Sequence, residues 1–196
     1  MNFLAHLYLA APADDALVGN FLGDFVKGPL AEAPDRYRRG IEMHRAVDTF
    51  TDDHPVHARA RARIEGPRRR VAGIIVDLCF DHFLAREWDD RRDEPLEDFS
   101  RRFYGLLEER EDHLPERVLR AMPHMTRENW LLGYREPQGI ARALDGLSRR
   151  RRRLGVLEGS GEELLRHYDG LRADFEAFFP LLETFVVERR RALPDQ

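Results

Sequence analysis

Hydrophobic positions along the chain recur with the three-to-four-residue spacing of amphipathic α-helices, and no stretch alternates as a β-strand does. This periodicity predicts helices at 1–10, 14–27, 36–54, 55–65, 68–89, 95–112, 115–132, 137–152 and 160–192. Proline is tolerated in the first turn of a helix, and four of these helices begin at or beside one, namely Pro55, Pro95, Pro115 and Pro137. No internal repeat, low-complexity tract or linker interrupts the pattern. We therefore expect a single all-α domain over residues 1–196, folded as a helical bundle.

The last predicted helix carries two local signals. Ser160 and Glu163 have the spacing of a capping box, which predicts that they open the helix. Pro180 lies inside it and predicts a kink or a split, because proline cannot donate the backbone hydrogen bond of a helix interior.

Composition narrows the class of protein. The chain has 196 residues, of which 42% are hydrophobic, enough to bury a sizeable core. No apolar run reaches the roughly 18 residues of a membrane span, and the N-terminus shows no secretion signal. The single cysteine, Cys79, cannot form an internal disulfide and lies in an apolar segment, so we interpret it as a buried packing residue and not a nucleophile. We expect a soluble cytoplasmic protein with no membrane partner, and the net charge of −4 argues against nucleic acid as its main partner.

Polar residues on apolar helix faces supply the candidate chemistry. In the helix at 36–54, His44 and Asp48 are four residues apart and share a face with Tyr37 and Ile41. A histidine and a carboxylate that meet in this way can ligate one metal ion, or the carboxylate can orient the imidazole ring.

The helix at 68–89 repeats this pattern with two carboxylates. Asp77 and Asp81 share a face with apolar residues such as Ile74 and Leu84, and burying two carboxylates is costly unless a positive group meets them. A metal ion is the simplest such group. His82 points about 100° away from Asp81 and would reach a shared metal only across a groove between helices.

The first two helices add Asn2 with His6 and Asn20 with Asp24, each again four residues apart. One such pair is also typical of a surface ion pair or a hydrogen-bonded core histidine. Four pairs in the first 82 residues favour a shared polar site, which we assign to residues 1–90. Histidine and aspartate ligands without thiolates favour Mn²⁺, Mg²⁺, Fe or Zn²⁺.

Several segments closely resemble the acyl carrier protein phosphodiesterase family: NFLAHLYLA, GNFLGDFVKG, GIEMHRAVDTFTDDHP, RRVAGIIVDLCFDHFLAREW and ENWLLGYR. The similarity extends over nearly the whole chain. It implies an HD-domain-like helical enzyme that uses a divalent metal, typically Mn²⁺ with Mg²⁺, Fe²⁺ or Co²⁺ as alternatives. The implied reaction removes 4′-phosphopantetheine from the serine of holo-acyl carrier protein.

The resemblance places a set of side chains at or beside the metal, namely Asp24, His44, Asp48, Asp77, Asp81 and His82. We expect Asp77 in the catalytic set, Arg45 to offset charge on the phosphoryl oxygens, and His6 or His82 to protonate the leaving serine oxygen. The adjacent pair Asp81-His82 reverses the His-Asp order of ordinary HD-domain proteins, so individual ligand roles do not transfer directly from them.

The second half of the chain, residues 95–193, is expected to cap the site and face the carrier protein. Five consecutive arginines are either a solvated helix end or a dock for that acidic partner: Arg149, Arg150, Arg151, Arg152 and Arg153. Three further residues belong either to the core or to a pocket for the pantetheine arm: Trp130, Tyr134 and His167. We expect solvent exposure for four other histidines: His54, His57, His113 and His124.

Two other functions use the same residues differently. An HD-like phosphohydrolase acting on a free nucleotide or alarmone would need the metal residues but no carrier dock. A non-catalytic helical adaptor for an acidic protein would need the arginines but no metal.

Overall fold

The computed structural model describes residues 1–150 and 152–192, and within this part of the chain it is helical with no strand, so the all-α prediction is confirmed. The α-helices are α1 (Phe3–Ala10), α2 (Asp14–Leu22), α3 (Asp35–Asp53), α4 (Pro55–Ala62), α5 (Ala72–Arg86), α6 (Trp88–Arg91), α7 (Leu96–Glu108), α8 (Glu116–Glu128), α9 (Trp130–Gly133), α10 (Pro137–Arg150), α11 (Glu162–Arg166) and α12 (Tyr168–Ala192). Short 3₁₀ helices are η1 (Leu30–Glu32), η2 (Gly66–Val71), η3 (Glu111–His113) and η4 (Arg152–Leu157).

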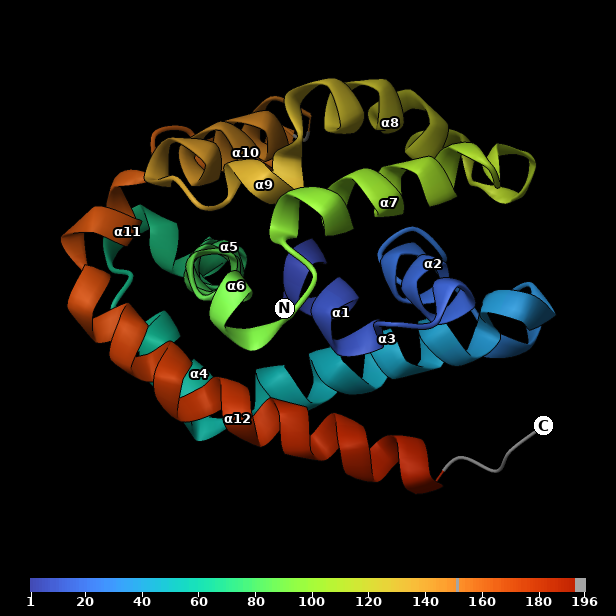
Figure 1. Cartoon of the computed structure of the whole chain (residues 1–196). Helices are drawn as coiled ribbons and strands as arrows, with labels where there is room; N and C mark the ends of the chain where they lie inside the picture. Colours follow the sequence, from blue (N-terminus) through green and yellow to red (C-terminus); the bar gives the residue numbers. More distant parts are fainter. Residues whose placement is uncertain (151, 193–196) are drawn as a thin grey trace.

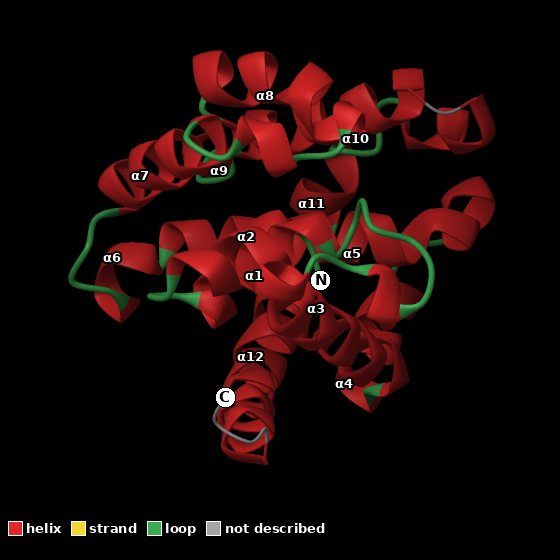
Figure 2. Ribbon diagram, turned by 90° about the vertical axis from the view of Figure 1, so that its right-hand side faces the viewer, coloured by secondary structure: helices red, strands yellow, loops and turns green. Residues whose placement is uncertain are grey.

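The helices lie in tiers around α1. Helices α7 to α10 form an upper tier above α1, α2 and α5, and α12 runs beneath them (Figures 1 and 2). Every residue of α1 from Leu4 to Ala10 is buried, and the helix carries no charged side chain. It packs against α2, α3 and α5. The N-terminal helix is therefore the centre of the core, and the chain begins inside the molecule (Figure 1).

Two glycines bring α2 and α3 into backbone contact. A Cβ added to Gly40 would lie 2.6 Å from the Cα of Gly19, a distance that real side chains do not reach. One turn further along, a Cβ on Gly23 would lie 2.2 Å from the imidazole of His44. The absence of side chains at these positions sets His44 directly against the end of α2.

The observed helix ends test three local predictions. Prolines do stand at the starts of α4, α7, α8 and α10, as predicted. The prediction that the second helix continues to residue 27 is wrong, because α2 ends at Leu22 and residues 23–29 form a turn. The capping box is also wrong: Ser160 Oγ donates to the carbonyl of Leu157, while Glu163 pairs with Arg68.

Pro180 does not split the last helix, since α12 runs unbroken through it. The residues around the proline hold the helix onto the core, because Phe178, Phe179 and Leu182 are fully buried. The break falls instead at His167, between α11 and α12.

Helix length and hydropathy also bear on membrane insertion. No helix within residues 1–150 and 152–192 is long and apolar enough to cross a bilayer.

Cys79 is fully buried, as predicted, and burial raises the pKa of its thiol.

Candidate active site

His6 is a buried polar group in the middle of the apolar helix α1, with 1% of its surface exposed. Its Nδ1 donates to Oδ1 of Asn20 on α2 at 3.2 Å, which leaves a lone pair on Nε2 of the neutral ring. Nε2 lies 3.1 Å from Oδ1 of Asp48 on α3. Burial, and then the neighbouring His44, lower the pKa of His6 and favour the neutral ring. An imidazole lone pair and a carboxylate oxygen therefore face each other at the edge of the core.

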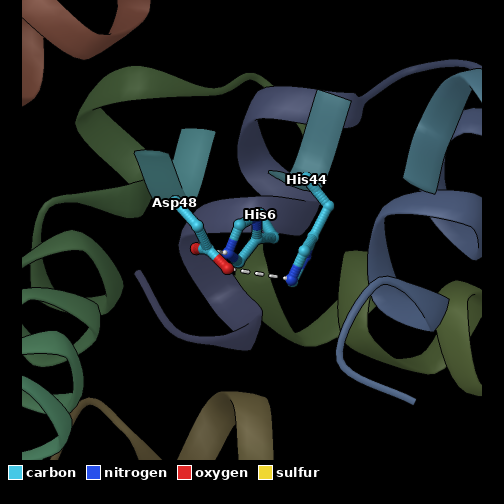
Figure 3. A group of neighbouring side chains, drawn as sticks. All are labelled: His6, His44 and Asp48. Carbon is cyan, nitrogen blue, oxygen red and sulfur yellow. Dashed lines mark hydrogen bonds and ion pairs between the residues drawn. The ribbon is translucent and has the colours of Figure 1, made fainter. Parts of the chain in front are cut away.

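His44 approaches the same carboxylate from the other side. Its Nε2 lies 3.2 Å from Oδ2 of Asp48, and its buried Nδ1 has no hydrogen-bond partner among the described residues. The rings of His6 and His44 stack with their centroids 3.9 Å apart. Figure 3 shows the three side chains converging from α1 and α3.

His6, His44 and Asp48 lie close enough to share one metal ion, since their ligand atoms are all within 4.8 Å of one another. Among the described residues, no other group of three or more histidine, cysteine or acidic side chains meets this condition. Burial tends to raise the pKa of Asp48, but its contacts with the imidazoles of His44 and His6 and the charge of the α-amino group outweigh burial and lower the pKa, so the carboxyl is ionised. Its side chain is 40% exposed, which opens the cluster to solvent. Two imidazoles facing an accessible carboxylate are a donor set that suits a divalent transition metal.

Two further acids border this cluster. Asp24 follows α2, and its Oδ1 lies 4.0 Å from Nε2 of His44. Asp77 on α5 places Oδ2 3.5 Å from the α-amino group of Met1, which in turn lies 3.3 Å from Asp48. Burial lowers the pKa of this amine, but Asp77 and Asp48 outweigh burial and raise it to about 10. The cluster is thus surrounded by carboxylates and includes one cation.

Asp77 has a partner that the sequence analysis missed. His57 was expected to be exposed, which is wrong: it is fully buried, and its Nε2 lies 3.0 Å from Oδ1 of Asp77. Burial tends to raise the pKa of Asp77, but the α-amino group and then His57 lower it below its usual value. The apolar neighbours Phe80 and Phe178 pack around the His57 ring. Nothing in the periodicity of the short helix α4 marks this position, whereas His113 and His124 are exposed as predicted.

Asp81 points elsewhere, although it lies one turn from Asp77. Both its oxygens accept hydrogen bonds from the start of α1, from the backbone N–H of Leu4 at 2.9 Å and of Ala5 at 3.0 Å, and Asn2 Nδ2 donates at 3.1 Å. Burial raises the pKa of this carboxyl to about 7, against the lowering effect of these hydrogen bonds. The carboxylate that was expected beside the metal here caps α1 from another helix, at the positive end of the helix dipole.

His82 and Arg45 also make contacts outside the cluster. His82 is fully buried; its Nδ1 donates to the carbonyl of Tyr134 at 2.9 Å, and its Nε2 lies 3.4 Å from the hydroxyl of Tyr168. Arg45 donates to the carbonyl of Val26 at 3.2 Å, in the turn that carries Asp24. It also lines a cleft of about 620 Å³ between α3 and α12, which neither His44 nor Asp48 lines.

The three residues considered for a pantetheine pocket do not lie together. Tyr134 is buried, and its hydroxyl lies 3.5 Å from Asn2 Nδ2, close to the N-terminus. Trp130 donates through Nε1 to Glu128, and its ring lies under the guanidinium of Arg150. His167 instead pairs with Glu163 in a separate cleft of about 630 Å³.

The fold and site define an all-helical protein with a solvent-accessible histidine–carboxylate cluster whose ligand types suit a divalent metal. A sequence model described as acyl carrier protein phosphodiesterase matches residues 1–182. The acyl carrier protein phosphodiesterase of Yersinia pestis is 41% identical over 184 residues, which cover 93% of this chain and 95% of the relative. The protein of the same name from Photorhabdus laumondii is 38% identical over 193 residues, covering 96% and 94%. A comparison with solved structures finds no match. The chain belongs to the acyl carrier protein phosphodiesterase family, a family of enzymes.

Proposed function

We propose that this enzyme hydrolyses the phosphodiester that links 4′-phosphopantetheine to the serine of holo-acyl carrier protein, releasing the apo form. The names of relatives that match over almost their whole length support the substrate. The observation that carries the chemistry is the contact between acceptor atoms of His6 and Asp48, since a shared cation removes the repulsion between them.

The residues that would hold the metal are His6, His44 and Asp48, with Asp24 and Asp77 at the edge of the cluster. A divalent ion, Mn²⁺ in this proposal, acidifies water and stabilises negative charge on phosphoryl oxygens when it is bound. The chain's own contribution is orientation. Asn20 fixes the tautomer of His6 so that Nε2 faces Asp48, as outer hydrogen bonds commonly do for metal ligands.

Asp77 enters the proposal as an ionised carboxylate that His57 holds at the edge of the cluster, where Oδ2 can accept a proton from water. Of the two histidines expected to compete for a catalytic role, only His6 is included. Both ring nitrogens of His82 are engaged elsewhere, Nδ1 by the backbone carbonyl of Tyr134 and Nε2 by the hydroxyl of Tyr168, so we leave it out of the site.

Mass spectrometry of holo-acyl carrier protein incubated with the enzyme tests the proposal. We expect loss of the phosphopantetheine mass with Mn²⁺, no loss with EDTA, and no loss with Asp48→Asn. His113→Ala, which alters an exposed histidine away from the cluster, is the matched control and should retain activity. If the wild-type enzyme leaves the holo protein intact with every divalent metal, the proposal fails, and a free nucleotide or alarmone becomes the substrate to test.

A further inference from the structure

Two arginine runs that are distant in the sequence lie side by side in the fold. The first is Arg68 to Arg70 in η2, and the second spans the end of α10 and the start of η4, where Arg151 lies outside the described residues. Helix η2 packs against η4. In addition, Arg68 donates to the carbonyl of Glu158 at 3.4 Å, just beyond η4. Tertiary packing therefore joins the two runs into one surface.

Within the described residues, the side chains of most of these arginines make no ion pair or hydrogen bond that stabilises the fold. Elsewhere, arginines are commonly paired; Arg63, for example, donates to Asp174 at 2.7 Å. The side chains of a group of exposed arginines make no ion pair or hydrogen bond with any other residue in the described part of the chain, and we call this group the arginine face: Arg69, Arg70, Arg149, Arg152 and Arg153. Arg68 is not included, because it pairs with Glu162 and Glu163. Like charges gathered without partners repel one another, so this arrangement contributes nothing to folding.

Acidic side chains do not cancel the charge of the arginine face. Glu65 and Glu158 flank it and are exposed, which leaves an excess of positive charge. The whole chain has a net charge of −4, so this excess is local. A local cation cluster on an acidic protein is suited to steering an acidic partner to one place on its surface.

A chain of contacts connects the arginine face to the candidate active site. Arg150, which lies between the described arginines of the second run, holds its guanidinium 5.0 Å from the centre of the Trp130 ring. Tyr134 is one turn beyond Trp130, and its hydroxyl lies 3.5 Å from Nδ2 of Asn2. The preceding residue, Met1, contacts Asp48 through its amine. This series of contacts runs from the arginine face through α9 to the N-terminus, whose amine touches the metal cluster.

We propose that the arginine face is the docking surface for the acidic protein substrate, and that Arg69 and Arg70 bind this substrate together with the arginines of α10 and η4. This inference rests on the proposed function, which makes acyl carrier protein the partner. Exposed guanidinium groups without internal partners are free to bind carboxylates in a bidentate manner. The surface acts mainly on the rate of encounter, so its effect must weaken as salt increases.

Steady-state kinetics with the double variant Arg69→Gln/Arg70→Gln test the inference. The quantity to measure is the ratio of kcat/KM for holo-acyl carrier protein to kcat/KM for a small chromogenic phosphodiester. We expect this ratio to fall about tenfold at low salt through a higher KM for the carrier protein, and the difference from wild type to disappear near 1 M salt, where the Debye length is about 3 Å. The matched control is Arg117→Gln/Arg191→Gln, which removes two exposed arginines that also lack described partners on other helices.

Binding of fluorescent apo-acyl carrier protein supplies a second readout that needs no turnover. Salt-sensitive binding that is weakened in Arg69→Gln/Arg70→Gln but not in the control, with equal melting temperatures, supports the docking surface. If wild-type enzyme cleaves the holo carrier and the double variant does so with unchanged KM, the docking inference fails and the proposed function stands. If wild-type enzyme neither cleaves the holo carrier nor binds the apo carrier, both fail. Tighter binding of a DNA or RNA duplex than of the carrier, lost in the same variant, would overturn the inference in favour of a nucleic-acid surface.

Discussion

Replacing Asp81 with alanine tests whether this buried carboxylate caps α1 or holds a metal ion. Its two oxygens accept the backbone N–H groups of Leu4 and Ala5 at 2.9 and 3.0 Å, and these donors are shielded from bulk water because Asp81 and both residues are fully buried. Each buried donor left unpaired costs about 1–3 kcal/mol. Removing the carboxylate also removes the cost of burying it, so the lower half of that range applies to each donor.

We therefore expect Asp81→Ala to lower the free energy of unfolding by about 2–4 kcal/mol. For a chain of this size, that loss corresponds to a melting temperature lower by roughly 4–16 °C. Urea unfolding followed by circular dichroism measures the free energy, and Mn²⁺ affinity of the folded variant is measured by competition with a chelator. The affinity should be close to that of wild type.

The control for this experiment is Asp145→Ala. Asp145 also accepts a backbone N–H, from Gly159 at 2.9 Å, but at the surface, where water can replace it. This change should cost less than about 1 kcal/mol. An Asp81→Ala protein that unfolds with wild-type free energy but no longer binds Mn²⁺ would refute the cap and return Asp81 to the ligand set.

Three further outcomes follow from the site and the helix contacts. Asn20→Ala should lower Mn²⁺ affinity about 10–100-fold, because the His6 ring loses the hydrogen bond that orients it; unchanged affinity in a chelator competition would contradict this role. Gly40→Ala should lower the free energy of unfolding by about 1–3 kcal/mol, because the new Cβ has no room against α2. The control Gly146→Ala, with open space around the new Cβ, should leave that free energy unchanged or raise it by up to about 1 kcal/mol. Equal melting temperatures of the two variants would argue against the close contact between α2 and α3. Finally, the pKa of Asp77 is lower in the folded state than the unfolded value of about 3.9, so ionised Asp77 stabilises the fold above that pH, and this stabilisation is lost as the pH falls through the lower folded value. The free energy of unfolding of the metal-free protein should therefore fall on acidification from about pH 5 to pH 2, and it should fall less steeply in Asp77→Asn. Urea titrations at each pH measure both.

The helices themselves were predictable from the sequence, because the period of apolar residues reflects local geometry that each helix carries alone. The same is true of pairs on one helix: His44 and Asp48 are four residues apart, and the structure brings their side chains together as that spacing predicts. Their role as metal ligands stays a prediction. The proline positions at the starts of helices were equally local and are confirmed.

Which groups from other helices contact a given side chain was decided only by the tertiary structure. Asp77 and Asp81 share one face of α5, yet Asp77 meets His57 and the α-amino group whereas Asp81 meets the backbone of α1. Periodicity along α5 cannot distinguish these environments, because the partners come from other helices and their positions depend on how those helices pack. His57 escaped prediction for the same reason, since α4 is short and the phenylalanines that bury this ring come from α5 and α12. The pairing of η2 with η4, which joins the two arginine runs, likewise has no signal in either segment, because a contact between distant parts of the chain exists only once the core has formed.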